Sequence, residues 1–259
     1  GSKYIQSIIG DSFIQVELFL KVGRKVLFSG TPCQIAGLKK FLRKEYNNLI
    51  TVDFVCHGVP SPGVFRWYMK EELKRYSDYV IKDIRFRDKC EGWKNFSFSI
   101  DLENIDSKEC VTLSQTLHEC SFLVGFLNNY YLRPSCHYCP AKQFKSSADI
   151  TLADYWGYNQ SDKIKDDDKG VSAIFISTKE GDRILHMVEP LYETVEYSDI
   201  LRINGAVEHS AQAPYREYFY SHSEMPFKTI IEKLVSEKIL NKARRKLYFL
   251  THKHEYYKG

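Results

Sequence analysis

Hydrophobic and polar positions in the first fifty residues change repeatedly between the spacing of a strand and that of a helix. Residues 11–22 (DSFIQVELFLKV) predict a helix that is capped by Asp11. The short apolar run RKVLFSG ends at Gly30, and the following TPCQIAGLKKFLRKEY has its apolar residues at helical spacing. We therefore expect a strand, a tight turn and a helix, with Thr31 as the N-cap and Pro32 in the first turn.

The same order recurs in the next segment of the chain. The β-rich run NLITVDFV is followed by the turn CHGVPSPG and by a helical pattern in VFRWYMKEELKRY. Two successive strand–helix units predict parallel strands whose carboxyl ends lie at one edge of a sheet. Open α/β sheets bind ligands at that edge. Cys33 and Cys56, which follow the two strands, are therefore expected to be neighbours.

The pattern changes after residue 79. Residues 79–113 alternate like exposed antiparallel strands and predict a β-rich insertion. Ser121 to Leu132 predicts an apolar helix, whereas ADITLADYWG and GVSAIFIST predict strands and KEGDRILHMV a helix. We expect an α/β domain over residues 1–225, with a mixed, mostly parallel sheet and flanking helices. A basic helical extension, one helix or a pair, is expected over residues 226–259.

Composition and charge narrow the class of protein. A net charge of +4 over 259 residues is too mild for a dedicated nucleic-acid binder. We find no run of about 18 apolar residues and no signal peptide, so we expect no membrane span. Seven cysteines without a secretory signal indicate a reducing cytoplasm and cysteines that serve in the core, in metal binding or in catalysis. The sequence starts with Gly-Ser rather than Met, and from Lys3 onward it resembles the middle of a longer chain, so we expect a fragment.

Four of the cysteines fall at predicted turns. Cys33 lies in the first turn of a helix, where a thiolate is favoured, and Cys56 ends a strand. Cys136 and Cys139 form a C-x-x-C pair just after Pro134. Four thiolates bind either zinc or an iron–sulfur cluster, and the ligand types do not choose between them. One close pair with two single cysteines favours a cluster, and a thioredoxin-type pair is disfavoured because no strand–helix junction surrounds it.

The other three cysteines have no partner at metal-ligand spacing. Free cysteine is among the most buried residue types. We therefore expect these three to be small core residues, and they are Cys90, Cys110 and Cys120.

Five segments occur in an order and spacing that resemble the coenzyme F420 hydrogenase/dehydrogenase beta-subunit family: SGTPCQIAGLKKFL, VDFVCHGVPSP, FRDKCEGW, RPSCHYC and ADITLADYWG. The resemblance covers Lys3 to about Thr178. It implies FAD beside a [4Fe–4S] cluster, and electron transfer between ferredoxin-type clusters and a hydride acceptor or donor. That partner is a deazaflavin in methanogen members and chlorophyll or other pigments in plant and cyanobacterial relatives. The implied cluster ligands are Cys33, Cys56, Cys136 and Cys139.

Family members often carry an N-terminal ferredoxin-like segment, and this sequence has none. We therefore expect a ferredoxin-like partner, either as a missing N-terminal segment or as a separate protein. A second departure lies at Ala153, where the family tends to have glycine before Asp-x-Trp-Gly. The methyl group of Ala153 would reduce the space available for a flavin that lies close to the backbone.

Candidate flavin ligands lie around the first turn. Ser29, Gly30 and Thr31 open a helix and could form an anion cradle, the alternative being an ordinary helix cap. Gln34 is a candidate donor to the flavin ring or its phosphates. A polar N-terminal group is expected either to line the same site or to be solvated, and it includes Lys3, Gln6 and Ser7.

Further candidates follow the later strands. Arg87 and Lys89 are expected to hold an acidic substrate tail or the flavin phosphates, with Trp93 stacking, the alternative being a charged turn. His57 and Asp154 are the candidate catalytic residues. His57 would serve as a proton relay or simply pack. Asp154 with Trp156 and Gly157 would form the flavin wall, or an ordinary strand end.

Together with these residues, the resemblance implies a flavin-dependent iron–sulfur oxidoreductase that exchanges hydride with a small molecule, deazaflavin F420 or another substrate. Two alternatives remain open. One is a zinc-stabilised four-cysteine binding or scaffold protein, which would be colourless. The other is an accessory enzyme of bacterial polysaccharide biosynthesis, since bacterial members of the family resemble proteins of such pathways.

Overall fold

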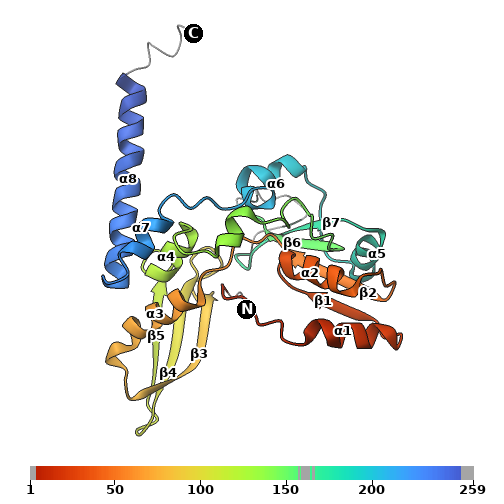
Figure 1. The fold of residues 1–259 in the computed structure, drawn as a ribbon, viewed down its shortest axis with the longest axis horizontal. Helices are drawn as coiled ribbons and strands as arrows, with labels where there is room; N and C mark the ends of the chain where they lie inside the picture. The colour runs from red at the N-terminus through yellow and green to blue at the C-terminus, as the bar shows by residue number, and fades with distance from the viewer. Residues whose placement is uncertain (1–3, 157, 159–163, 165–166, 252–259) are drawn as a thin grey trace.

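The chain folds into two lobes, each built on its own sheet (Figure 1). The structure is a computed structural model, and it describes residues 4–156, 158, 164 and 167–251. Two of the candidate cofactor-binding residues, Lys3 and Gly157, lie outside these ranges.

The first lobe contains a four-stranded sheet in the order β1-β2-β6-β7. The first three strands of this order are parallel, and β7 runs antiparallel to β6. This confirms the predicted mixed, mostly parallel sheet. The strands are β1 (Val26–Ser29), β2 (Leu49–Phe54), β6 (Ile150–Asp154) and β7 (Ser172–Ile176).

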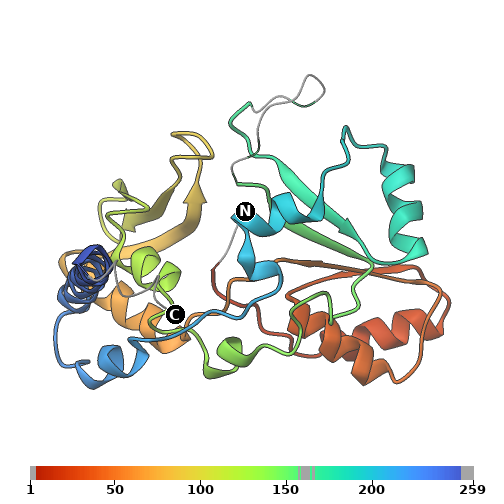
Figure 2. The same cartoon turned by 90° about the horizontal axis from the view of Figure 1, so that it is seen from above.

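Helices cover both sides of this sheet (Figure 2). On one side lie α1 (Ser12–Lys21) and α2 (Pro32–Leu42), and on the other lie α5 (Lys179–Val188) and α6 (Tyr197–Ile203). Helix α2 begins as predicted, because Thr31 caps it and its backbone N–H donates to the Gln34 Oε1 at 2.8 Å.

The second lobe contains a three-stranded antiparallel sheet, as the alternating pattern predicted. The strands are β3 (Tyr79–Asp88), β4 (Ser97–Asn104) and β5 (Cys110–Thr116). Helical segments pack against it, and they are α3 (Pro62–Glu72), η1 (Leu73–Arg75), α4 (Ser121–Leu127), α7 (Arg216–Ser221) and the start of α8 (Phe227–Thr251). The largest core of the described residues lies here and is rich in Phe and Tyr, so most of the aromatic content serves packing.

The helix predicted over residues 121–132 is shorter than expected and ends at Leu127. Asn129 adopts a left-handed conformation with φ 68°, which stops the helix. Leu132 then pairs with Pro60 in an isolated antiparallel bridge. Burial of the intervening Tyr130 and Tyr131 in the core favours this turn over continued helix.

Within the described residues, the C-terminal segment forms one helix, α8, rather than a pair. Its first turns are buried in the core of the second lobe through Phe227, Ile230, Ile231 and Leu234, whereas the rest of α8 projects from the body (Figure 1). The domain boundary that we place at residue 226 stays a prediction. None of the helices that the structure describes is long and apolar enough to cross a membrane.

A buried carboxylate joins the strands of the first lobe. Asp149 accepts hydrogen bonds from the Thr51 backbone N–H at 2.7 Å, the Thr51 hydroxyl at 2.6 Å and the Thr178 hydroxyl at 2.7 Å. Burial by itself would raise the pKa of Asp149, but these hydrogen bonds outweigh it and hold the pKa below its ordinary value.

Asp149→Ala is expected to lower the free energy of unfolding by about 3 kcal/mol at pH 7, because it leaves buried donors without an acceptor. Because the pKa of Asp149 is lower in the folded protein than in the unfolded chain, its ionised carboxylate stabilises the folded protein in full above about pH 3.9, the pKa of an unfolded Asp. This stabilisation is lost as the pH falls through the folded-state pKa. Urea unfolding at pH 7 and at about pH 3 should therefore show the larger difference at pH 7. Asp106→Ala, at an exposed turn, is the control. An equal loss in both variants would contradict the prediction.

Candidate functional site

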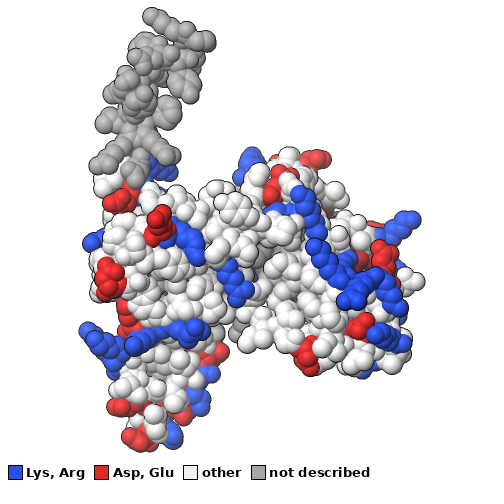
Figure 3. Space-filling model, in the orientation of Figure 1, with Lys and Arg blue, Asp and Glu red and all other residues white. Residues whose placement is uncertain are grey.

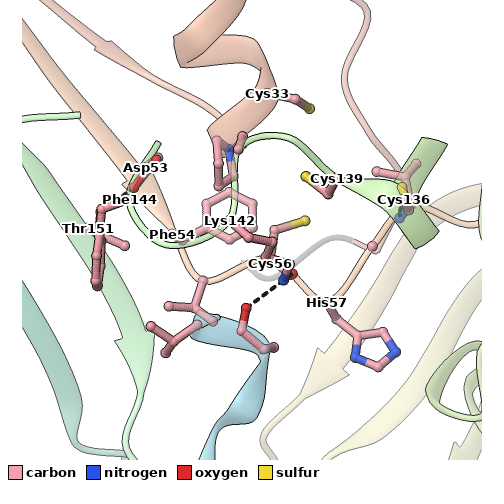
Figure 4. Close-up of a pocket in the computed structure, with 17 residues that line it drawn as sticks. Cys33, Asp53, Phe54, Cys56, His57, Cys136, Cys139, Lys142, Phe144 and Thr151 are labelled. Carbon is pink, nitrogen blue, oxygen red and sulfur yellow. Dashed lines mark hydrogen bonds between the residues drawn. The ribbon is translucent and has the colours of Figure 1, made fainter. Parts of the chain in front are cut away.

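The four cysteines singled out by the sequence line one pocket (Figure 4). Cys33 comes from the first turn of α2, and Cys56 lies two residues after β2. Cys136 lies in the short helix η2 (Pro134–Tyr138), and Cys139 directly follows it. Cysteines more than a hundred residues apart in the sequence thus line the same pocket.

Strand register brings the first two cysteines together. Parallel pairing aligns Ser29 at the end of β1 with Val52 of β2. The turn after β1 and the turn after β2 therefore leave the sheet at the same carboxyl edge. This arrangement confirms the expectation that Cys33 and Cys56 are neighbours.

Hydrogen bonds fasten the C-x-x-C segment to the turn after β2. The Arg133 N–H donates to the Val59 carbonyl at 2.8 Å, and the Val59 N–H donates to the Cys136 Sγ at 3.4 Å. The Cys139 N–H donates to the Ser210 hydroxyl at 3.1 Å. Hydrogen bonds from outside η2 thus hold both cysteines of the pair in place.

Burial and backbone donors act in opposite directions on the sulfurs. Burial raises the pKa of Cys56 to about 11, and a hydrogen bond from the Gly58 backbone works against it. Burial also raises the pKa of Cys136, against the Val59 N–H. Gly58 needs to be glycine here, because its φ is 146° and a Cβ would come 2.7 Å from the Leu132 side chain. The backbone N–H groups of Gly58 and Val59 would stabilise the thiolate forms of Cys56 and Cys136, and a metal binds the thiolate form.

Lys142 lies in the same pocket and was missed in the sequence. Its ammonium donates to the carbonyls of Cys56 at 2.7 Å and Ala206 at 2.5 Å, the latter drawn in Figure 4. Burial lowers its pKa, while the nearby cysteines, including Cys139, raise it. The ammonium therefore offers positive charge to sulfurs that become thiolates. Its position three residues after Cys139, in CHYCPAK, was the available signal.

The sulfurs are spread around the pocket rather than gathered at a point (Figure 4). Within the described ranges, no three Cys, His, Asp or Glu side chains form a group that could hold a metal ion. Four thiolates on one zinc would each lie about 2.3 Å from the ion. As arranged here, the cysteines do not form that compact geometry.

His57 lies beside the pocket, but its ring points away from the sulfurs (Figure 4). The ring packs against Phe126 at 5.0 Å between centroids, and its Nε2 lies 3.3 Å from the Phe126 carbonyl. Burial lowers the pKa of His57 and favours the neutral ring. This geometry fits the packing alternative, and a proton-relay role stays a prediction.

The candidate anion cradle is largely satisfied from within the protein. Gly30 donates its backbone N–H to Val52 at 3.1 Å, and the Gln34 amide caps Thr31 and contacts the Ser7 carbonyl at 3.4 Å. Ser29 is part of β1. From the polar N-terminal group, the Gln6 Nε2 lies 3.4 Å from the Thr31 hydroxyl and 3.9 Å from the Cys33 Sγ. These groups therefore cover the start of α2, and their role as flavin ligands stays a prediction.

Other predicted residues form a second group, where the two lobes meet. The Arg87 Nη1 donates to the Asp154 Oδ2 at 2.8 Å. Trp93 and Trp156 stack with 4.1 Å between ring centroids and 13° between planes. Lys89, by contrast, donates to the Lys169 carbonyl at 3.1 Å.

The expectation for the remaining cysteines was wrong in two cases. Cys120 is buried as expected, but Cys90 and Cys110 are exposed. Cys90 lies in the loop after β3, and Cys110 opens β5 at a position that faces outward. Cys90 and Cys110 are not part of the hydrophobic core of the second lobe, so the general preference of free cysteine for burial does not apply to them.

Comparison with known proteins adds one finding. Residues 23–199 match the family model for the C terminus of the beta subunit of coenzyme F420 hydrogenase/dehydrogenase. The matched range includes all four pocket cysteines, Lys142 and the Arg87–Asp154 pair. No curated protein matches the chain.

Proposed function

The chain belongs to the coenzyme F420 hydrogenase/dehydrogenase beta-subunit family, an oxidoreductase family, and on that premise we propose that it is a flavin-dependent iron–sulfur oxidoreductase. In this proposal it passes electrons in a reducing cytoplasm between a ferredoxin-type partner and a small-molecule hydride acceptor or donor. The observation that carries the proposal is the convergence of Cys33, Cys56, Cys136 and Cys139 on one pocket.

The donor set fits a [4Fe–4S] cluster better than a single zinc ion. Iron–sulfur clusters take four cysteine thiolates, and hydrogen bonds to the sulfurs help to tune their potential. Cys56 and Cys136 each accept a backbone N–H. Sulfurs that surround a pocket suit a polynuclear group, whereas zinc needs the compact tetrahedron described above.

Bound FAD would supply the chemistry that joins two-electron hydride transfer to one-electron transfer. The protein's part is to hold the ligands and to exclude water. Arg87, Trp93 and Trp156 support a site for a planar anionic ligand, because they combine a cation with stacked rings. Asp154 orients Arg87 through the ion pair.

An exposed cysteine and a basic surface support an acidic electron partner. Cys33 is exposed at the rim of the pocket. Lys39 and Lys40 lie in the last turn of the same helix, α2. On the face drawn in Figure 3, Lys and Arg side chains gather over the first lobe. Charge complementarity of this kind steers association with negatively charged proteins.

The proposal is tested by purifying the protein without oxygen and measuring its visible spectrum, iron, acid-labile sulfide, zinc and flavin together. We expect about four iron and four sulfide per chain, with a broad visible absorbance that dithionite bleaches. Stoichiometric zinc without iron would overturn the proposal and favour the scaffold alternative.

A further inference from the structure

A second pocket lies where the N-terminal segment crosses from one lobe to the other. It has a volume of about 440 Å³, which is enough for a small organic molecule. Its walls come from residues 5–9, from Gln34 of α2, from Pro62 at the start of α3 and from Arg133 just before η2. It shares no lining residue with the cysteine pocket. Ligands often bind between packed units of this kind.

Contacts on both sides hold the N-terminal segment that forms one wall. In the second lobe, the Tyr4 ring packs against Phe126 with 4.9 Å between ring centroids. In the first lobe, the Gln34 Nε2 donates to the Ser7 carbonyl at 3.4 Å. The residues between Tyr4 and Ser7 therefore span the junction of the two lobes, where Figures 1 and 2 both place this segment.

Half of the lining residues are apolar. They are Ile5, Ile8, Ile9 and Pro62. The Ile8 side chain is 95% exposed, so almost none of it is covered by the rest of the described structure. Removing an aliphatic side chain of this size from water is favourable. A ligand with an apolar body would cover Ile8 and gain that contribution.

A single cation faces these apolar walls. Arg133 is the one ionisable residue among the described residues that line the pocket. Its Nη1 donates to the Gln6 Oε1, which is a neutral acceptor, and no carboxylate of the described residues forms an ion pair with it. A guanidinium has further N–H donors, and two of them can bind both oxygens of a carboxylate. The pocket therefore favours an anionic ligand.

The amide side chains in the lining are already engaged within the protein. The Gln34 Oε1 accepts the Thr31 backbone N–H at 2.8 Å, and the Gln6 Nε2 lies 3.4 Å from the Thr31 hydroxyl. The polar edge of a flavin ring would need free amide donors and acceptors, and a diphosphate would need more positive charge than one arginine supplies. The groups left for a ligand are the Arg133 cation and the apolar walls, which together fit a carboxylate on an apolar body.

We propose that this pocket binds a small organic carboxylate with an apolar body. Arg133 binds the carboxylate, and Ile8 and Ile9 cover the body. Gln6 lines the pocket and its Nε2 lies 3.9 Å from the Cys33 Sγ, so one side chain separates the ligand from the nearest pocket cysteine. The inference rests on the proposed function in one respect, because a ligand placed there would be its small-molecule partner.

Binding is measured by isothermal titration calorimetry on the full chain with three probes. Cinnamate and cinnamyl alcohol share an apolar body and differ in the carboxylate, whereas acetate supplies a carboxylate without the body. In the wild type, we expect cinnamate to bind about 10-fold more tightly than cinnamyl alcohol, because only cinnamate forms charged hydrogen bonds with Arg133. Cinnamate should also bind at least about 10-fold more tightly than acetate, because acetate leaves Ile8 exposed.

Two variants separate the contribution of the charge from that of the apolar wall. Arg133→Gln should weaken cinnamate binding by about 10-fold and leave cinnamyl alcohol unchanged. Ile8→Ser should weaken both ligands by about threefold to 10-fold, and the exposure of Ile8 means that the fold does not depend on it. Arg75→Gln, at an exposed arginine in η1 of the second lobe, is the matched control and should bind as the wild type does.

Absence of cinnamate binding, or equal affinity for cinnamate and cinnamyl alcohol in the wild type, would overturn the inference. Unchanged cinnamate binding in either Arg133→Gln or Ile8→Ser would do the same. FMN that displaces cinnamate, and that loses affinity in Arg133→Gln, would assign the pocket to a flavin instead. Thermal melting of each variant reports folding. Iron per chain is measured in every preparation, so a failure of carboxylate binding in iron-loaded protein is distinct from a failure of the proposed function.

Discussion

Cys56→Ala is expected to reduce the iron of anaerobically purified protein from about four atoms per chain to less than about one. Burial raises the pKa of Cys56 to about 11, and the Lys142 ammonium donates to its backbone carbonyl. Alanine removes one of four thiolates and leaves the backbone in place. Iron, sulfide and visible absorbance are measured on wild type and variant together.

Cys110→Ala is the matched control for this experiment. It makes the same substitution at an exposed cysteine in the second lobe, away from the pocket. We expect the control to keep its iron and both variants to keep the far-ultraviolet dichroism of the wild type. A folded Cys56→Ala protein with the full iron content would exclude Cys56 as an iron ligand. An equal loss of iron in Cys56→Ala and Cys110→Ala would show that the loss is not specific to the pocket.

Lys142→Met is expected to have two separate effects. In the protein without bound iron, it leaves the carbonyls of Cys56 and Ala206 without their donor, which should lower the free energy of unfolding by about 3 kcal/mol. In protein that retains iron, loss of a positive charge beside the thiolates makes reduction less favourable. The midpoint potential should therefore become more negative, because the negative charge that repels an added electron is less well compensated.

The two effects are measured by urea unfolding and by a dye-equilibrated redox titration. Lys145→Met, at an exposed position three residues further on, removes the same charge outside the pocket and should change both quantities little. A midpoint potential that is the same in Lys142→Met and in the wild type would show that Lys142 acts only on the fold.

Local signals in the sequence determined the strand–turn–helix units and the choice of four cysteines. Helix α2 starts where Thr31, Pro32 and Gln34 predicted, because a capping box involves residues three positions apart. The turn after a strand is likewise set by nearby residues, so the sequence alone could place Cys33 and Cys56 at one sheet edge. The helix predicted through Leu132 failed, because the burial of Tyr130 and Tyr131 is a property of the whole core.

Only the tertiary structure decided how distant groups meet. Lys142 reaches the Cys56 carbonyl and Arg87 reaches Asp154 across 86 and 67 residues of sequence. Pairing of Val52 with Ile150 in adjacent parallel strands sets the common edge, and no local pattern specifies which strands become neighbours. The sequence by itself therefore singled out the four cysteines as candidate metal ligands, and Arg87 and Trp93 as candidate ligands of a planar anion. Packing and strand order determined which of them share a site, because those contacts depend on the complete core rather than on the spacing of residues along the chain.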